Sequence, residues 1–165
     1  SAASNDAPSR IAMAFCISLG WNESIRNGHN AFNMLLEIEK KTNSNHWVQY
    51  LLGKSYDLGT GVNEDFDKAF RYYSLSAKQN NVLAMSGLAS CYDEGYGTGI
   101  NKAAAFEWYE RAAKLGDCYA MDSLGLIYEV GDGVDLDENK AREWYTKAAL
   151  QLHPLAKEAL GRLRV

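Results

Sequence analysis

Three acidic side chains recur at one spacing of 36 residues (93 − 57 and 129 − 93): Asp57, Asp93 and Glu129. Each follows a tyrosine and precedes two glycines, in YDLGTGV, YDEGYGT and YEVGDGV. Carboxylates repeated in one register could bind a row of basic groups, which would give orientation and association rate. The alternative is a solvated helix end whose charge is compensated by Lys54 or by loop amides. Both interpretations stay open at this point.

Other reactive side chains fit no catalytic or metal-binding pattern. His29, His46 and His153 are scattered along the chain, without the spacing of a metal site or of a nucleophile and its base. The GKS triplet at 53–55 lacks the earlier glycine of a phosphate loop. An EF-hand loop begun at Asp135 lacks its glycine and its final glutamate. We therefore expect no catalytic residue, no metal site and no cofactor, and predict that the chain is not an enzyme.

Composition narrows the class of protein. The chain has 165 residues, of which 47% are hydrophobic, and only 2 are prolines, which favours a folded, helical domain. A net charge of −4 without a Lys/Arg-rich run argues against nucleic-acid binding. No apolar run approaches the roughly 20 residues of a membrane span. The chain begins SAASNDAPSR, without Met, and we expect it to be a piece of a larger protein.

The 36-residue period predicts repeated pairs of helices, because a constant period of this length is typical of solenoids. In each copy, apolar and small residues at offsets of 4, 1 and 3 form one helical stripe. A glycine then suits the left-handed end of that helix, and an Asp or Asn in register ahead of a second apolar stripe suits the N-cap of a second helix. The stripe residues are Val48, Leu52, Gly53 and Tyr56, then Ala84, Leu88, Ala89 and Tyr92, then Ala120, Leu124, Gly125 and Tyr128. The turn glycines are Gly59, Gly95 and Gly131, and the N-caps are Asp65, Asn101 and Asp137.

The second helix of each copy combines large aromatic residues with alanines. Large rings opposite small residues suit interdigitating helices, and one helix pair could not cover these faces alone. The aromatic pairs are Tyr72–Tyr73, Trp108–Tyr109 and Trp144–Tyr145. We therefore predict that the repeats stack.

The third copy carries a specific pattern: Leu-Gly-x-x-Tyr-x-x-Gly-x-Gly-Val, a capping Asp, and Lys-Ala-x-x-Trp-Tyr-x-Lys-Ala-Ala. With these residues the chain resembles the Sel1-like repeats, which are relatives of the tetratricopeptide repeat. The resemblance covers about residues 45–165 well and 10–44 poorly. The matching residues are Leu124, Gly125, Tyr128, Gly131, Gly133, Val134, Asp137, Lys140, Ala141, Trp144, Tyr145, Lys147, Ala148 and Ala149.

The resemblance implies an all-α fold, a right-handed α-solenoid of helix–turn–helix repeats with a 36-residue period (93 − 57). The first helices would line a concave groove. If tetratricopeptide geometry carries over, groove-facing positions follow at spacings of about 3, 4 and 3. The predicted partner-binding residues are Trp47, Tyr50, Lys54, Asp57, Leu83, Ser86, Ser90, Asp93, Tyr119, Asp122, Leu126 and Glu129. Trp47 and Tyr50 could instead pack against the preceding unit.

The predicted organisation has four parts. Residues 1–9 are a disordered or artificially added segment, 10–44 a degenerate helix pair, 45–152 three full Sel1-like repeats, and 153–165 a capping helix. The resemblance implies a protein-interaction module, an adaptor or scaffold that binds a peptide or helix in the groove. We expect a protein or peptide partner, basic and with apolar anchors, no nucleic acid, and no membrane insertion by this segment. The alternative is a non-catalytic accessory or spacer domain of a larger enzyme. Cytoplasm, slightly favoured, and ER lumen both stay open.

Overall fold

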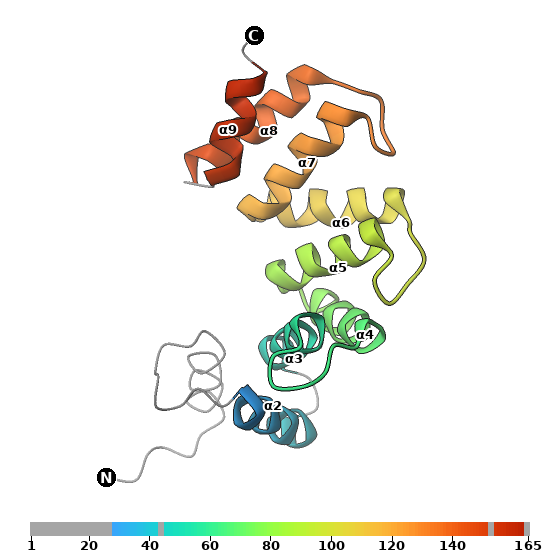
Figure 1. Ribbon diagram of the computed structural model, residues 1–165. Helices are drawn as coiled ribbons and strands as arrows, with labels where there is room; N and C mark the ends of the chain where they lie inside the picture. The colour runs from blue at the N-terminus through green and yellow to red at the C-terminus, as the bar shows by residue number, and fades with distance from the viewer. Residues whose placement is uncertain (1–27, 43–44, 152–153, 164–165) are drawn as a thin grey trace, which may run out of the picture. The chain divides into compact units, whose positions relative to one another are not determined.

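The computed structural model describes residues 28–42, 45–151 and 154–163, and all regular elements in these ranges are helices (Figure 1). They are α2 (Gly28–Thr42), α3 (His46–Leu58), α4 (Phe66–Ala77), α5 (Val82–Glu94), α6 (Lys102–Lys114), α7 (Cys118–Val130), α8 (Glu138–Leu150) and α9 (Pro154–Arg162). The predicted segment 1–9 and the first helix of the predicted pair at 10–44 lie outside the described residues. The chain divides into two compact units, Ser1–Ala84 and Met85–Val165, which are described separately.

In the first unit, α3 packs against α4 and α2 packs against α3 (Figure 1). The core between α3 and α4 is made of apolar and small side chains, because Val48, Leu52 and Ala69 are almost completely buried. Gly53 allows the two helices to approach closely. A Cβ at this position would lie 2.8 Å from the Tyr73 ring.

The second unit repeats this arrangement. Helix α7 packs against α6 and α8, and α8 also packs against α9 (Figure 1). Leu124 on α7 and Tyr145 on α8 are fully buried. Gly125 is the counterpart of Gly53, and a Cβ there would lie 2.6 Å from two carbon atoms of the Tyr145 ring. The small residues on the predicted stripe therefore serve close helix approach.

The predicted helix ends are confirmed. Gly59, Gly95 and Gly131 have positive φ angles of 64°, 80° and 72°, in the left-handed region that glycine adopts without strain. The side chains of the three predicted N-caps each accept a backbone N–H from the first turn of α4, α6 or α8. These caps are Asp65, Asn101 and Asp137.

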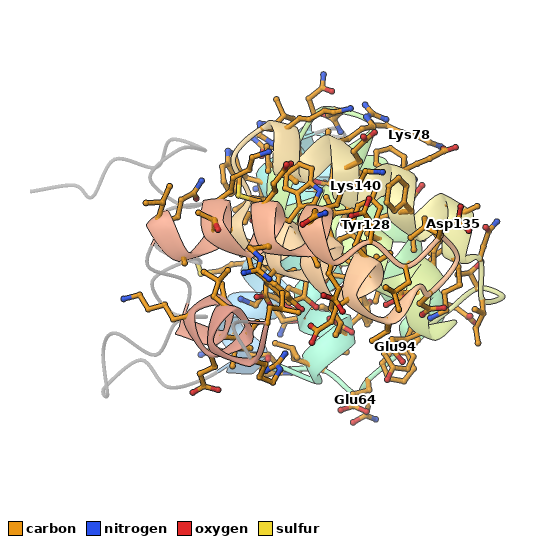
Figure 2. All side chains as sticks on the ribbon, turned by 90° about the horizontal axis from the view of Figure 1, so that it is seen from above. Glu64, Lys78, Glu94, Tyr128, Asp135 and Lys140 are labelled. Carbon is orange, nitrogen blue, oxygen red and sulfur yellow. The ribbon has the colours of Figure 1, made fainter. Side chains whose placement is uncertain are left out.

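The repeated tyrosine before each acid lies at the edge of the core. Tyr56 is buried, whereas Tyr92 and Tyr128 are half-buried. The Lys140 amine lies 5.0 Å from the centroid of the Tyr128 ring, and Figure 2 shows the two side chains next to each other. A lysine amine over a ring face adds a cation–π contact.

The first helices also have caps at the 36-residue spacing (81 − 45 and 117 − 81), which the sequence analysis did not identify: Asn45, Asn81 and Asp117. Asn45 caps α3 and Asp117 caps α7. Asn81 Oδ1 accepts the backbone N–H of Ala84 at 3.1 Å. The capping pattern therefore applies to both helices of a repeat.

We expect Asn81→Ala to lower the free energy of unfolding by about 1–2 kcal/mol, because the buried Asn81 caps α5 and its Nδ2 also contacts His46 Nδ1 at 3.1 Å. Urea unfolding followed by circular dichroism would measure the change. Asn63→Ala, at an exposed turn position of the same unit, is the matched control and should be close to neutral. Equal losses in the two variants would contradict the cap.

Candidate protein-binding site

Each repeated acid contacts a side chain on the second helix of its own repeat. Asp57 Oδ2 accepts the hydroxyl of Tyr73 at 3.0 Å, and Glu129 Oε2 accepts that of Tyr145 at 2.6 Å. Both rings are buried, and a buried tyrosine hydroxyl needs an acceptor. Burial, together with the Glu129 carboxylate, raises the pKa of Tyr145. This partner was not foreseen by either interpretation of the acid.

The second repeat departs from this pattern. The Tyr109 hydroxyl lies 3.0 Å from Ser90 Oγ, while Asp93 forms an ion pair with Lys102. The residue between the helices here is Ala89, where the other two repeats have glycine. The change of hydroxyl partner thus coincides with the change from glycine to alanine at this position.

Lys102 connects this repeat to the following turn. Its Nζ lies 2.7 Å from Asp93 Oδ1 and 2.8 Å from Asp132 Oδ2. Hydrogen bonds to Asp132 and Asp93 raise the pKa of Lys102, so it stays charged at neutral pH. Gly133 lies directly over this side chain, since a Cβ there would lie 2.9 Å from Lys102 Cβ. The α7–α8 turn is thereby held to the N-terminal end of α6.

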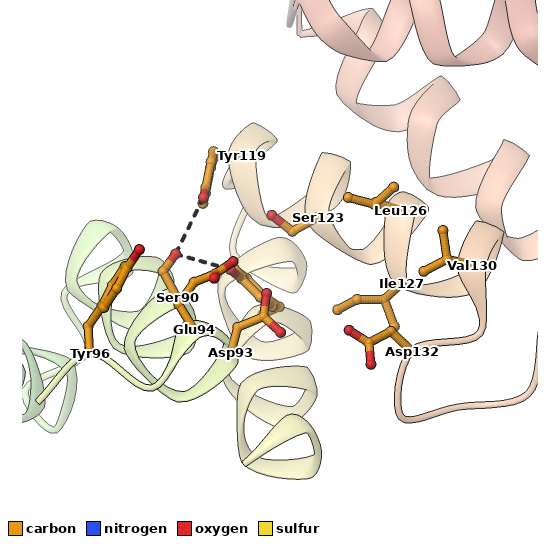
Figure 3. A pocket seen from close by; sticks show the side chains of 11 residues that line it. Ser90, Asp93, Glu94, Tyr96, Tyr119, Ser123, Leu126, Ile127, Val130 and Asp132 are labelled. Atoms are coloured by element: carbon orange, nitrogen blue, oxygen red, sulfur yellow. Dashed lines mark hydrogen bonds between the residues drawn. The ribbon is translucent and has the colours of Figure 1, made fainter. Parts of the chain in front are cut away.

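A cavity of about 430 Å³ lies in the second unit, between the end of α5 and α7 (Figure 3). Figure 3 shows Asp93, Glu94 and Tyr96 on one side, with Leu126, Ile127 and Val130 from α7 on the other. We call it the α5–α7 pocket. Its lining residues are Ser90, Asp93, Glu94, Tyr96, Tyr109, Tyr119, Ser123, Leu126, Ile127, Val130 and Asp132. It combines exposed aromatic, aliphatic and acidic groups, and its size suits a ligand site.

Four of the predicted partner-binding residues meet in the α5–α7 pocket: Ser90, Asp93, Tyr119 and Leu126. Tyr119 is 49% exposed and Leu126 is 50% exposed, so both can contact a partner. The Tyr119 hydroxyl lies 3.4 Å from Ser90 Oγ.

Three further predicted residues belong to the second unit but not to the pocket lining. Asp122 and Glu129 are half-buried. Ser86 is 5% exposed, and its hydroxyl donates to the carboxylate of Asp117, the cap of α7. Ser86 is therefore buried and hydrogen-bonded to the cap of α7, and it does not belong to the accessible surface.

The other five predicted residues belong to the first unit. Trp47 and Leu83 are exposed, and Tyr50, Lys54 and Asp57 are half-buried. The Trp47 and Tyr50 rings form an edge contact with centroids 6.3 Å apart, and Tyr50 lies 6.1 Å from Tyr73 of its own repeat. Lys54 lines a small cavity of about 40 Å³ with Leu51, Ser55, Leu58 and Thr60. The described part of this unit therefore presents an aromatic surface around Trp47 and Tyr50.

Most of the pocket wall was not predicted from the sequence. Ser123, Ile127 and Val130 continue the side of α7 that carries Tyr119 and Leu126, at steps of three and four residues. Tyr96 and Asp132 come from the turns after α5 and α7. The helical periodicity could have identified the first group, whereas turn residues have no periodicity from which to predict their direction.

Two further features were sought in the described part of the chain. No group of three or more His, Cys, Asp or Glu side chains there could hold a metal ion. None of the helices in it has the length and apolar character needed to cross a membrane.

The structure is similar to solved Sel1 repeat proteins. A Sel1 repeat protein from Oxalobacter formigenes is 26% identical in sequence and has a TM-score of 0.84. The match covers 97% of this chain and 64% of that protein. A protective antigen of uropathogenic Escherichia coli with an SLR fold is 29% identical in sequence and has a TM-score of 0.84. The match covers 97% of this chain and 34% of that protein. A sel1 repeat protein from Klebsiella pneumoniae, at 17% identity, a TM-score of 0.61 and coverage of 99% and 80%, supports the fold alone. The chain thus spans less than two thirds of the first two relatives.

These likenesses confirm the predicted fold class, an all-α solenoid of helix–turn–helix repeats. No curated protein matches the sequence. The family model of the Sel1 repeat matches residues 48–81, 82–117 and 118–151, which together make up more than half of the chain. The chain belongs to the Sel1 repeat family.

Proposed function

We propose that this chain is a non-catalytic protein-interaction module, an adaptor or scaffold, that binds a peptide segment of another protein at the α5–α7 pocket. Protein interaction is the common role of Sel1 repeats. The observation that supports this location is the meeting of exposed aromatic, aliphatic and acidic side chains around one cavity of about 430 Å³.

Tyr119 and Leu126 are the expected anchors. Both side chains are about half exposed and both line the pocket, so a partner can bury a large apolar area on them. Buried aromatic and aliphatic anchors supply most of the affinity of an interface. The acids around them add orientation and association rate. A partner with apolar anchors and basic residues would match both features.

We expect Tyr119→Ala and Leu126→Ala each to weaken peptide binding at least about tenfold, a loss of about 1.4 kcal/mol or more. The probe is a set of peptides selected on the wild-type chain from a random library displayed on phage. Fluorescence anisotropy with the synthetic peptides would measure the dissociation constants. Circular dichroism would verify that each variant is folded.

Leu155→Ala is the matched control, because Leu155 is an exposed leucine of the same unit that lies on α9, outside the pocket. It should leave the dissociation constants unchanged. Selected peptides that bind all three variants as tightly as the wild type would refute the pocket as the binding site. A selection that yields no binder would favour the spacer or accessory domain instead.

A further inference from the structure

We infer that the α5–α7 pocket recognises the guanidinium group of an arginine side chain in the partner. This inference rests on the proposed function and names the chemistry that the pocket selects. Its basis is the combination of net negative charge, accessible tyrosine rings and an aliphatic wall within one cavity.

The charge of the pocket is negative after its internal ion pairs are counted. Three carboxylates line it, those of Asp93, Glu94 and Asp132. One Lys102 amine binds both Asp93 and Asp132, so one positive charge and three negative charges leave a net charge of −2 (1 − 3). Glu94 is exposed and the Asp132 side chain is 43% exposed, so both remain accessible to a cation from a partner.

The remaining lining suits the body of an arginine side chain. The ring of Tyr96 is 43% exposed, and that of Tyr119 is similarly accessible. A guanidinium group is planar and stacks on aromatic faces. Leu126 and Val130 on α7 provide an aliphatic wall along which the methylene stem can lie (Figure 3).

Arginine fits these groups better than lysine does. Its donors form a planar fork that binds a carboxylate through two hydrogen bonds, and it is less strongly hydrated than an ammonium group. Both cations contact aromatic rings within this unit, since the Arg111 guanidinium lies 4.4 Å from the centroid of the Trp108 ring and the Lys147 amine 4.1 Å from that of Trp144, so the carboxylate fork is what favours arginine. A lysine would keep the charge attraction and a contact with a ring, but it would lose the two parallel hydrogen bonds of the fork.

In the second repeat the acid, Asp93, lines the pocket and binds Lys102 in place of the tyrosine of the second helix. The Tyr73 hydroxyl donates a hydrogen bond to Asp57, whereas the Tyr109 hydroxyl is hydrogen-bonded to Ser90 and not to Asp93. Asp93 instead shares Lys102 with Asp132. This arrangement gathers the two aspartates at one side of the cavity.

The test uses three small probes: N-acetyl-argininamide, N-acetyl-lysinamide and N-acetyl-citrullinamide. Citrulline has nearly the shape of arginine but carries no charge. We expect millimolar binding of the arginine probe, with shifts of the Glu94, Tyr96 and Asp132 amide signals in two-dimensional NMR spectra. The lysine probe should bind several-fold more weakly, and the citrulline probe at least about tenfold more weakly.

Glu94→Gln and Glu107→Gln form a matched pair of variants. Both replace an exposed glutamate of the second unit, but only Glu94 lines the pocket. Binding of the arginine probe should weaken several-fold in Glu94→Gln and stay unchanged in Glu107→Gln. Equal weakening in both variants would overturn the inference, because it would indicate only the overall charge.

Failure of the inference is distinguishable from failure of the proposed function. Equal binding of all three probes, or no binding of any, would overturn the arginine site. Library peptides without basic residues that still depend on Tyr119 would also overturn it, but would support the proposed function. Tyr119-dependent peptides whose binding is lost when one arginine is replaced by citrulline would support both.

Discussion

Tyr145→Ala is expected to lower the free energy of unfolding by about 3–5 kcal/mol, which is the usual loss for an aromatic core residue. The Tyr145 ring is 1% exposed and packs against Gly125 of α7. Its hydroxyl also donates to Glu129, so truncation removes that hydrogen bond as well. Urea unfolding followed by circular dichroism would measure the loss. Because small domains are stable by only about 5–15 kcal/mol, this loss is a large fraction of the total stability.

Two companion variants separate the ring from the hydroxyl and from the neighbouring tryptophan. Tyr145→Phe keeps the ring and should cost about 1–3 kcal/mol, the worth of a hydrogen bond to a charged group. Trp144→Ala should cost less than Tyr145→Ala, because Trp144 is half-buried and lies under the Lys147 amine. If Tyr145→Ala lowered the free energy of unfolding no more than Trp144→Ala does, the assignment of Tyr145 to the core would be contradicted.

Much of the fold could be predicted because the repeat supplies independent signals that agree. The 36-residue period predicts the helix pairs, and Asp65, Asn101 and Asp137 predict the starts of the second helices. Gly59, Gly95 and Gly131 predict the turns, where the structure has positive φ angles. Each rests on local backbone chemistry, which a single sequence contains. The caps of the first helices have the same period and could have been found in the same way.

Contacts between side chains could not be predicted equally well. The partners of Asp57 and Glu129 are tyrosines 16 residues further along (73 − 57 and 145 − 129), and finding them requires the crossing of two helices. The same period places Asp93 in their register, yet Lys102 binds it instead. A repeat specifies the backbone of each unit, whereas its side-chain partners differ from one repeat to the next.

The candidate site combines both situations. Ser90, Asp93, Tyr119 and Leu126 could be predicted because the family geometry implies which side of a first helix faces a groove. The turn residues Tyr96 and Asp132 complete the pocket, and their direction depends on the conformation of each turn. The position of Ser86 on the stripe was not sufficient to expose it, because the cap of the following helix binds its hydroxyl.

We expect Gly125→Ala to destabilise the chain by about 2–3 kcal/mol, in the upper part of the usual range for overpacking. Alanine is normally the better helix former by about 1 kcal/mol, so the expected sign is opposite to that of helix propensity. The added Cβ would lie 2.6 Å from the Tyr145 ring, which must therefore move. Urea unfolding beside Gly161→Ala gives the matched comparison, because a Cβ at that helical position meets nothing within 4 Å. Gly161→Ala should be neutral or slightly stabilising, because Gly161 lies in the last turn of α9.

The second repeat explains why Tyr145 cannot simply adapt to an alanine. With Ala89 in place, Tyr109 keeps a partner because Ser90 lies next to it along the helix. The residue corresponding to Ser90 in the third repeat is Leu126 (126 − 90 = 36), which has no hydroxyl. A displaced Tyr145 would therefore lose its hydrogen bond to Glu129 and would meet no hydroxyl at position 126. Gly125→Ala combined with Leu126→Ser should recover part of the loss, whereas a single Gly125→Ala variant as stable as Gly161→Ala would show that α7 and α8 can separate without cost.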